Sequence, residues 1–226
     1  MKVFIYTTFL VICALSYSSM AADKLVVDNF NDGDNRTEQN GWWFAYNDNR
    51  IGGNSQCTPA ANTFTPTKGN DSQGWAGRLT GLTGTKLGWD YIGLGFSLNA
   101  DAGCPTAKPM DISKYHTLEF KMKGSASAGR LIVSILYMED NTCDGMVPIS
   151  KTAWADHQAG VTSDLNAEWT TVKLDLRKDF AQPSWTKAAN VVPIEEVLRH
   201  AHIINWHFYS SDGDTLDLWI DDVVLY

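Results

Sequence analysis

The chain has 226 residues, a formal net charge of −8, and 44% hydrophobic and 12% aromatic residues. The length suits a single all-β domain, and the acidic balance argues against nucleic acid and against anionic membrane surfaces. We therefore expect no nucleic-acid partner and no membrane partner.

Residues 1–21 are predicted to be a secretory signal peptide. Lys2 precedes an apolar run that ends at Leu15, and residues 19–21 have the small-x-small pattern of a cleavage site. The apolar run is too short to span a bilayer comfortably. The mature chain, residues 22–226, would be one secreted domain, either extracellular or periplasmic.

A short apolar strand at residues 25–27 is followed by an acidic turn. Asp28, Asn31, Asp32 and Asp34 supply hard oxygen donors of the kind that calcium prefers. The spacing differs from that of an EF-hand loop, and no glutamate closes the turn. A calcium site and a solvated turn both remain open at this point.

Alternating apolar and polar residues then predict a series of short strands and almost no helix. The strands are expected at residues 41–46, 75–82, 88–98, 115–123, 130–138, 169–176, 203–209 and 216–226. One short helix is expected to start at a proline, over residues 193–200. The last two strands read as an antiparallel hairpin, with the terminal strand central to its sheet because it is too apolar for an edge. The pattern is typical of a β-sandwich or jelly roll.

Two of these strands have outward faces of unusual composition. On one strand Tyr91, Gly93 and Gly95 share a face, and glycines at such positions weaken a strand. Either a flat ligand approaches the backbone there, in a shallow trough, or the glycines mark a β-bulge or a position that a neighbouring large side chain covers. On the strand at residues 203–209, the side chains of Asn205, His207 and Tyr209 point outward together.

Aromatic rings suit the CH faces of sugars, and amide, carboxylate and imidazole groups suit their hydroxyls. The alternatives are that Tyr209 caps the sheet, that His207 is structural, and that Trp154 lies under its own loop. The candidate carbohydrate-binding residues come from strands and from a long polar loop at residues 139–158. They are Tyr91, Glu119, Asp140, Trp154, Asn205, His207 and Tyr209.

Three cysteines remain once the signal is removed: Cys57, Cys104 and Cys143. Export makes a disulfide plausible. If the strands around them run up, down and up, Cys104 and Cys143 follow strand ends at the same rim, so we expect this pair, although three single pairings are possible.

An enzyme is a rival hypothesis, and a protein-interaction or assembly domain is a third. A glycosidase needs two carboxylates facing each other across a cleft, and Glu119 and Glu139 are the one strand-borne pair that the sequence offers. The chain has no Gly-x-Ser-x-Gly elbow and no His-Glu-x-x-His motif. We therefore predict no catalytic residues.

Four stretches, in order, carry a resemblance to a known family. They are residues 27–30 (VDNF), 111–120 (DISKYHTLEF), 168–172 (EWTTV) and 218–223 (LWIDDV). Together they resemble the galactose-binding-like jelly rolls, in particular carbohydrate-binding modules of families 11 and 30 and the related domain first named for a complex I assembly factor.

The resemblance implies a β-sandwich jelly roll of two antiparallel sheets, with a concave sheet that binds polysaccharide without catalysis. The ligand expected from it is a plant-type β-glucan, or else mannan or xylan, bound by a monomer. It also implies a structural calcium ion near the chain ends, held by Asp28, Asn31, Asp32 and Asp221. Tyr209 stands where a sugar-stacking tyrosine is expected.

Overall fold

The computed structural model describes residues 23–226, except residues 70–73, 100–107, 140–142, 145–146 and 149–150. Residues 1–21, predicted as a signal peptide, and Cys104 lie outside the described part, so neither the signal nor the predicted disulfide is tested. Cys57 is a free thiol. No helix in the described ranges is long and apolar enough to cross a membrane.

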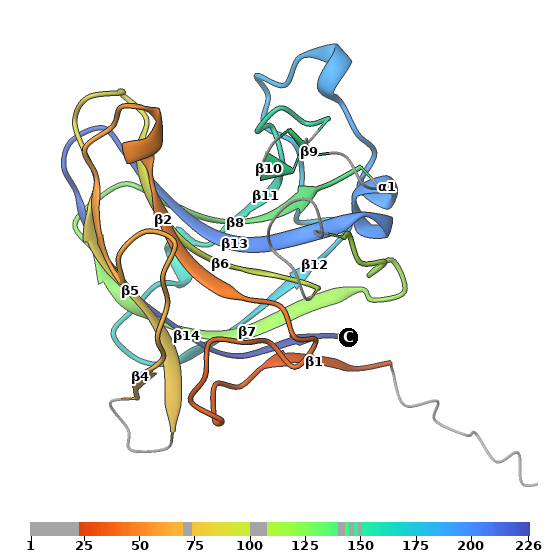
Figure 1. The fold of residues 1–226 in the computed structure, drawn as a ribbon, viewed down its shortest axis with the longest axis horizontal. Coiled ribbons are helices and arrows are strands. Elements are labelled where there is room, and N and C mark those ends of the chain that lie inside the picture. Colours follow the sequence, from red (N-terminus) through yellow and green to blue (C-terminus); the bar gives the residue numbers. More distant parts are fainter. Residues whose placement is uncertain (1–22, 70–73, 100–107, 140–142, 145–146, 149–150) are drawn as a thin grey trace, which may run out of the picture.

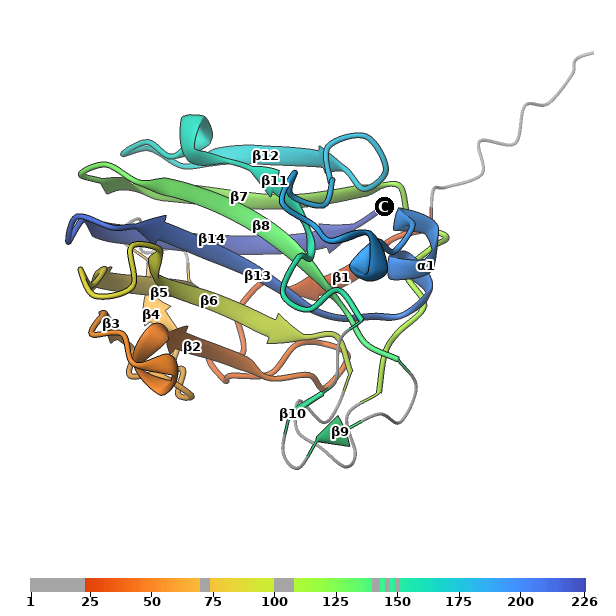
Figure 2. The same ribbon diagram turned by 90° about the horizontal axis from the view of Figure 1, so that it is seen from above.

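Two antiparallel sheets pack face to face, as the sequence predicts (Figure 1). The smaller sheet has the order β11-β8-β13-β6-β2 (Figure 2). Its strands are β2 (Trp43–Asn47), β6 (Asp90–Ser97), β8 (Arg130–Tyr137), β11 (His157–Gly160) and β13 (Ala201–Ser210).

The larger sheet has the order β12-β7-β14-β5-β3, with β1 beside β14 and β4 beside β5. Its strands are β1 (Leu25–Asp28), β3 (Gln56–Thr58), β4 (Thr67–Lys68), β5 (Trp75–Leu82), β7 (Thr117–Ala126), β12 (Thr170–Asp175) and β14 (Thr215–Leu225). The remaining elements are the hairpin of β9 (Cys143–Asp144) and β10 (Val147–Pro148), three short 3-10 helices η1 (Asp48–Ile51), η2 (Thr162–Asp164) and η3 (Ala188–Asn190), and the helix α1 (Ile194–Arg199).

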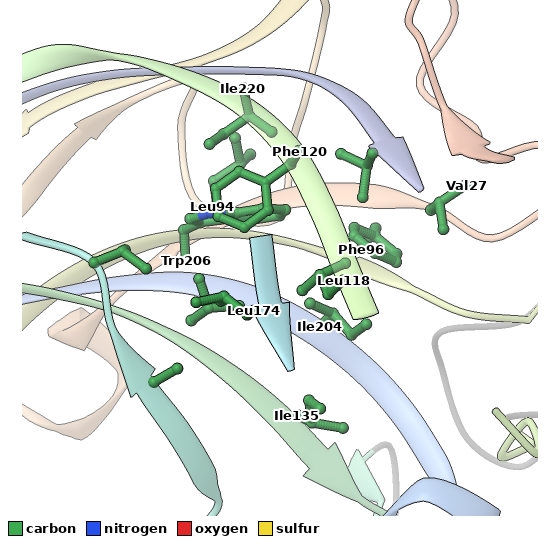
Figure 3. Packing of buried hydrophobic residues seen from close by; sticks show 14 of the residues in the cluster. Val27, Leu94, Phe96, Leu118, Phe120, Ile135, Leu174, Ile204, Trp206 and Ile220 are labelled. Atoms are coloured by element: carbon green, nitrogen blue, oxygen red, sulfur yellow. The ribbon is translucent and has the colours of Figure 1, made fainter. Parts of the chain in front are cut away.

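Alternate side chains of both sheets fill the space between them (Figure 3). Trp206 lies at the centre of this core: its ring meets Phe120 of the opposite sheet edge-on at 5.0 Å and stacks on Trp43 at 6.0 Å between ring centroids. Burial of each such side chain stabilises the fold by roughly 2–3 kcal/mol. The sandwich is therefore held by apolar contacts between the sheets.

The predicted hairpin of the last two strands is wrong. β13 pairs with β6 and β8, whereas β14 pairs with β1, β5 and β7. Each strand has one apolar face, with Trp206 and Phe208 on β13 and Leu218 and Ile220 on β14, and all four are buried. Because β13 and β14 belong to opposite sheets of the sandwich, their apolar faces are both turned to the core between the sheets. The terminal strand is central to its sheet, as expected.

The connections between strands gather at the two ends of the smaller sheet, whose outer face is concave (Figure 1). At one end rise η1 and the connection from β5 to β6. At the other end rise the β9–β10 hairpin and the segment before α1. The concave face thus lies between two sets of loops.

Candidate functional site: the concave face of the smaller sheet

The outward side chains of the smaller sheet stand in rows that cross its strands. Because paired residues point to the same side, the register fixes the members of each row. Starting from the end at η1, the rows are Arg130, Tyr209 and Tyr91; then Gly160, Ile132, His207, Gly93 and Tyr46; then Gln158, Ser134, Asn205, Gly95 and Phe44. Four predicted site residues, Tyr91, Asn205, His207 and Tyr209, therefore share this face.

An aromatic cluster, made of Tyr46, Tyr91, His207 and Tyr209, occupies the first two rows. The ring of His207 is at its centre, 3.9 Å from the ring of Tyr209, 4.6 Å from Tyr91 and 5.5 Å from Tyr46 between centroids. The Tyr46 hydroxyl and His207 Nδ1 are 3.0 Å apart and share a hydrogen bond. His207 thus points to the outer side of the sheet, but its side chain is hydrogen-bonded and half-buried among the rings.

The aromatic cluster carries no charge near neutral pH. Burial lowers the pKa of His207 to about 3, because a buried imidazolium would lose its hydration. Burial likewise raises the pKa of Tyr209 to about 12 and the pKa of Tyr46 well above its ordinary value. A surface of neutral rings suits an uncharged ligand with apolar CH faces.

Side chains of the protein fill the space above the two glycines. A Cβ on Gly93 would collide with Cζ and Oη of Tyr46, and one on Gly95 would lie 2.7 Å from Cβ of Asn205. The covering large side chain is confirmed at Gly93, whereas at Gly95 the close atoms are Cβ of the paired Asn205 and backbone atoms. A trough of bare backbone over both glycines is therefore wrong. The face presents the rings and edges of the aromatic cluster instead of bare backbone.

Glu119 does not belong to this face. It lies on β7 of the larger sheet, where its carboxylate is 2.7 Å from Lys173 Nζ and borders a cavity of about 280 Å³ that Tyr226 also lines. The alternating pattern correctly predicts that Glu119 points away from the core. It does not predict which of the two sheets contains its strand. Glu139 follows β8 of the smaller sheet, so the structure does not bring together the carboxylate pair that a glycosidase would need.

The two loop candidates have different outcomes. Trp154 is 70% exposed and has a φ of 71°, so it is not tucked under its own loop. It makes no ring contact with the aromatic cluster among the described residues. Asp140 lies outside the described residues, and its placement is not tested.

Asp156, which begins the approach to β11, is a carboxylate that the sequence did not single out. Thr152 Oγ1 donates to Asp156 Oδ1 at 2.6 Å. Burial raises the pKa of Asp156 to about 6, and its charge in turn raises the pKa of both Tyr46 and Tyr209. It therefore lies within electrostatic reach of the aromatic cluster.

Two aromatic residues of this face were also missed. Tyr46 was placed on a strand without an assigned face. Trp89 is 54% exposed, and its ring stacks with that of Tyr91 at 6.2 Å and 20°. The signal for Trp89 was its spacing of two from Tyr91, which puts both residues on one side of an extended strand.

The predicted calcium ligands are engaged with the protein. The carboxylate of Asp28 accepts hydrogen bonds from Phe30 N and Trp43 Nε1, both at 2.6 Å. Asp32 accepts from Asp34 N, Asp221 accepts from Asp222 N, and Asn31 lies against Gly74. In the described part of the chain, no three Asp, Glu, His or Cys side chains come together to hold a metal. These residues therefore do not form a ready cluster, and the calcium site stays a prediction.

Comparison with solved structures shows what this fold is similar to. A family 11 carbohydrate-binding module from the cellulosomal cellulase Lic26A-Cel5E of Clostridium thermocellum matches with a TM-score of 0.54 and 16% identity, over 91% of this chain and 95% of that one. The chain is similar in fold to family 11 carbohydrate-binding modules. The predicted resemblance is thus confirmed at the level of the fold.

Two further structures extend this comparison. A family 11 module from Clostridium thermocellum in complex with a β-1,3-1,4-mixed-linked tetrasaccharide matches with a TM-score of 0.55 and 16% identity, over 91% of this chain and 96% of that one. A family 30 carbohydrate-binding module matches with a TM-score of 0.49 and 16% identity, over 76% of this chain and 90% of that one. No protein-family model matches the chain, and no curated protein matches its sequence.

We predict that Gly93→Ala lowers the free energy of unfolding by about 1–3 kcal/mol, because the new methyl group displaces the ring of Tyr46. In a Tyr46→Ala background the space is free, so the same substitution should cost little. Urea denaturation of the two single variants and the double variant measures both costs. Equal costs in the two backgrounds would show that Tyr46 does not cover Gly93.

Asp156 should make stability depend on pH. Its pKa is about 6 in the folded protein against 3.8 in the unfolded chain, so the folded state holds the proton more tightly. The resulting contribution is complete below about pH 4 and is lost as the pH rises through about 6. We expect the difference in unfolding free energy between the wild type and Asp156→Asn to change by about 3 kcal/mol across this window. A difference that is constant with pH contradicts the prediction.

Proposed function

We propose that the protein binds polysaccharide without catalysis on the concave face of the smaller sheet. The observation that carries the proposal is the uncharged aromatic cluster, which stands on this face between two sets of loops. The similarity in fold to a family 11 module complexed with a mixed-linked tetrasaccharide supports the same class of ligand. We propose β-glucan as the first ligand to test, with mannan and xylan as the alternatives.

Contacts of two kinds are available along the rows. The rings of Tyr91 and Tyr209 offer faces to sugar CH groups, where burial of apolar area and ring contact both favour binding. Gln158 stands in the third row and is half-buried, so its amide can reach hydroxyls, whereas Asn205 in the same row is buried. Because the rows cross five strands, a linear chain of sugars laid along them would meet several of these groups.

Secretion belongs to the same proposal, since polysaccharides of this kind are met outside the cytoplasm. The support for it is the signal-like pattern of residues 1–21. An enzyme is the alternative to be tested, although Glu119 and Glu139 stand on different sheets.

We expect Tyr209→Ala to weaken binding by about tenfold or more, equivalent to about 1.4 kcal/mol, because a stacking ring is lost. Retardation in gels containing mixed-linked β-glucan, mannan or xylan measures the affinity. The melting temperature should stay near that of the wild type, since the tyrosine is only partly buried.

The matched control is Tyr226→Ala, which removes a partly buried tyrosine from the opposite sheet, beside the cavity that Glu119 borders. It should leave retardation unchanged. If Tyr226→Ala loses retardation and Tyr209→Ala does not, the binding site is at that cavity. If the wild type is not retarded by any member of a broad glycan panel, the binding proposal is wrong. If the protein releases reducing sugar from these glycans, it is an enzyme and the non-catalytic proposal is wrong.

The structural calcium ion is a separate proposal, with Asp28, Asn31, Asp32 and Asp221 as its ligands. A metal bound only to the folded state raises stability by mass action, so chelator should lower the melting temperature and added calcium should restore it. Differential scanning calorimetry with and without chelator measures the shift. An unchanged melt would remove the calcium from the proposal.

A further inference from the structure

The connection from β5 to β6, residues 83–89, carries Trp89 at the rim of the concave face. Its ring is 54% exposed and stacks with that of Tyr91. Gly88, just before Trp89, has a φ of 73°, which L side chains rarely adopt. An exposed tryptophan on a connecting loop loses rotamer and backbone freedom if it must become ordered on binding. The groups that fix this loop before binding therefore decide how much freedom Trp89 would lose on contact with a ligand.

Asp90 folds the loop around its own side chain. The carboxylate is fully buried, and it accepts hydrogen bonds from Lys86 N at 3.1 Å, Leu87 N at 2.9 Å and Gly88 N at 3.0 Å. Burial alone would raise the pKa of Asp90, but these backbone N–H groups outweigh it and lower the pKa. The carboxylate is thus held ionised by the segment that leads into Trp89.

A second buried carboxylate, Asp48 in η1, fixes the other side of the loop. It accepts from Ser55 N at 3.0 Å, from Ser55 Oγ at 2.6 Å and from Tyr91 N at 3.1 Å. Ser55 Oγ in turn accepts from Gly84 N at 2.7 Å, and Asn54 Oδ1 accepts from Thr85 N at 3.1 Å. Asp48 therefore ties η1 directly to the start of β6.

Four side chains together, Asp48, Asn54, Ser55 and Asp90, accept six backbone N–H groups between residues 84 and 91. Buried carboxylates are expensive unless their oxygens are satisfied by donors. Here the loop's own N–H groups satisfy Asp90, and Ser55 and Tyr91 satisfy Asp48, with no cation among the described partners. The result is a fixed backbone on both sides of an exposed ring.

We propose that Trp89 is a further ligand-stacking residue, continuous with Tyr91, and that Asp48 and Asp90 are positioning residues that hold the two rings ready for the sugar chain. This inference rests on the proposed polysaccharide binding. In precise binding sites, the residues that contact the ligand are held in place by packing and by hydrogen bonds from the residues around them. The competing explanation is that the network only shapes a turn.

A double-mutant cycle with mixed-linked β-glucan separates these explanations. We expect Trp89→Ala to weaken binding about tenfold, equivalent to about 1.4 kcal/mol, and Asp90→Asn to weaken it about fivefold. In the Trp89→Ala background, Asp90→Asn should have no further effect on affinity, while its effect on the melting temperature remains. An equal loss of affinity from Asp90→Asn in both backgrounds would overturn the positioning role.

Two further variants distinguish a loss of ring positioning from a general loss of stability. Asn54→Ala removes the acceptor of a single N–H group on an exposed residue, and it should weaken binding by a smaller factor in the same direction. Asp175→Asn is the control: its carboxylate accepts from Arg177 N and Lys178 N at the end of β12, in the larger sheet. It should lower the melting temperature without changing affinity. If it weakens binding as much as Asp90→Asn, the effect is one of general stability and the inference fails.

A measurement without ligand distinguishes this inference from the proposed function. The heteronuclear NOE of the Trp89 indole N–H, assigned by its absence in Trp89→Phe, should be as high in the wild type as that of backbone amides in the sheets. It should fall in Asp90→Asn. An indole that is mobile in the wild type overturns the inference even if the glycan binds. A wild type that binds no glycan but keeps a rigid indole removes the proposed function and the stacking role that rests on it, and it leaves only the positioning of the ring by Asp48 and Asp90.

Discussion

The register of β13 between β6 and β8 fixes both the core and the concave face. Trp206 and Phe208 point inward and are fully buried, which forces His207 and Tyr209 outward. A slip of one residue would exchange the two sets and expose both inward rings, at a cost of roughly 2–3 kcal/mol for each. The apolar core therefore holds the aromatic cluster in place, although none of its own residues touches a ligand on that face.

The aromatic cluster is packed as tightly as its position on a sheet surface allows. Tyr46 lies over Gly93, so a larger residue at that position would displace the ring that shares a hydrogen bond with His207. Two buried polar atoms on this face, His207 Nε2 and Asn205 Oδ1, have no hydrogen-bond partner in the described part of the chain. Such atoms cost about 1–3 kcal/mol each when unsatisfied. Unsatisfied polar atoms are one of the departures from good packing and hydrogen bonding that proteins tolerate at functional sites.

Alternation along single strands was enough to predict the longer strands and the outward direction of Asn205, His207 and Tyr209. It did not predict the short strands β3, β4, β9 and β10, or β11, which begins inside the loop expected at residues 139–158. It could not predict which sheet a strand joins, because that choice depends on apolar faces far apart in the sequence. The misplaced Glu119 and the wrong terminal hairpin both follow from this gap. Trp89 had a local signal in its spacing of two from Tyr91, but the hydrogen bonds that fix the backbone beside it come from Asp48 in η1, which is distant in the sequence.

The exposed large apolar side chains of the described chain are not spread evenly. They lie in or beside the connections at the two ends of the smaller sheet, and they are Ile51, Leu82, Trp89, Trp154, Trp185 and Val191. Single exposed apolar residues are ordinary, but several on loops that flank one face indicate a binding surface. The loops before β11 and before α1 are joined, since Gln182 Nε2 donates to Ala155 O and Gln182 Oε1 accepts from Val192 N. Side-chain hydrogen bonds thus hold loops at both ends of the face, with the buried Asp48 and Asp90 at one end and the half-buried Gln182 at the other.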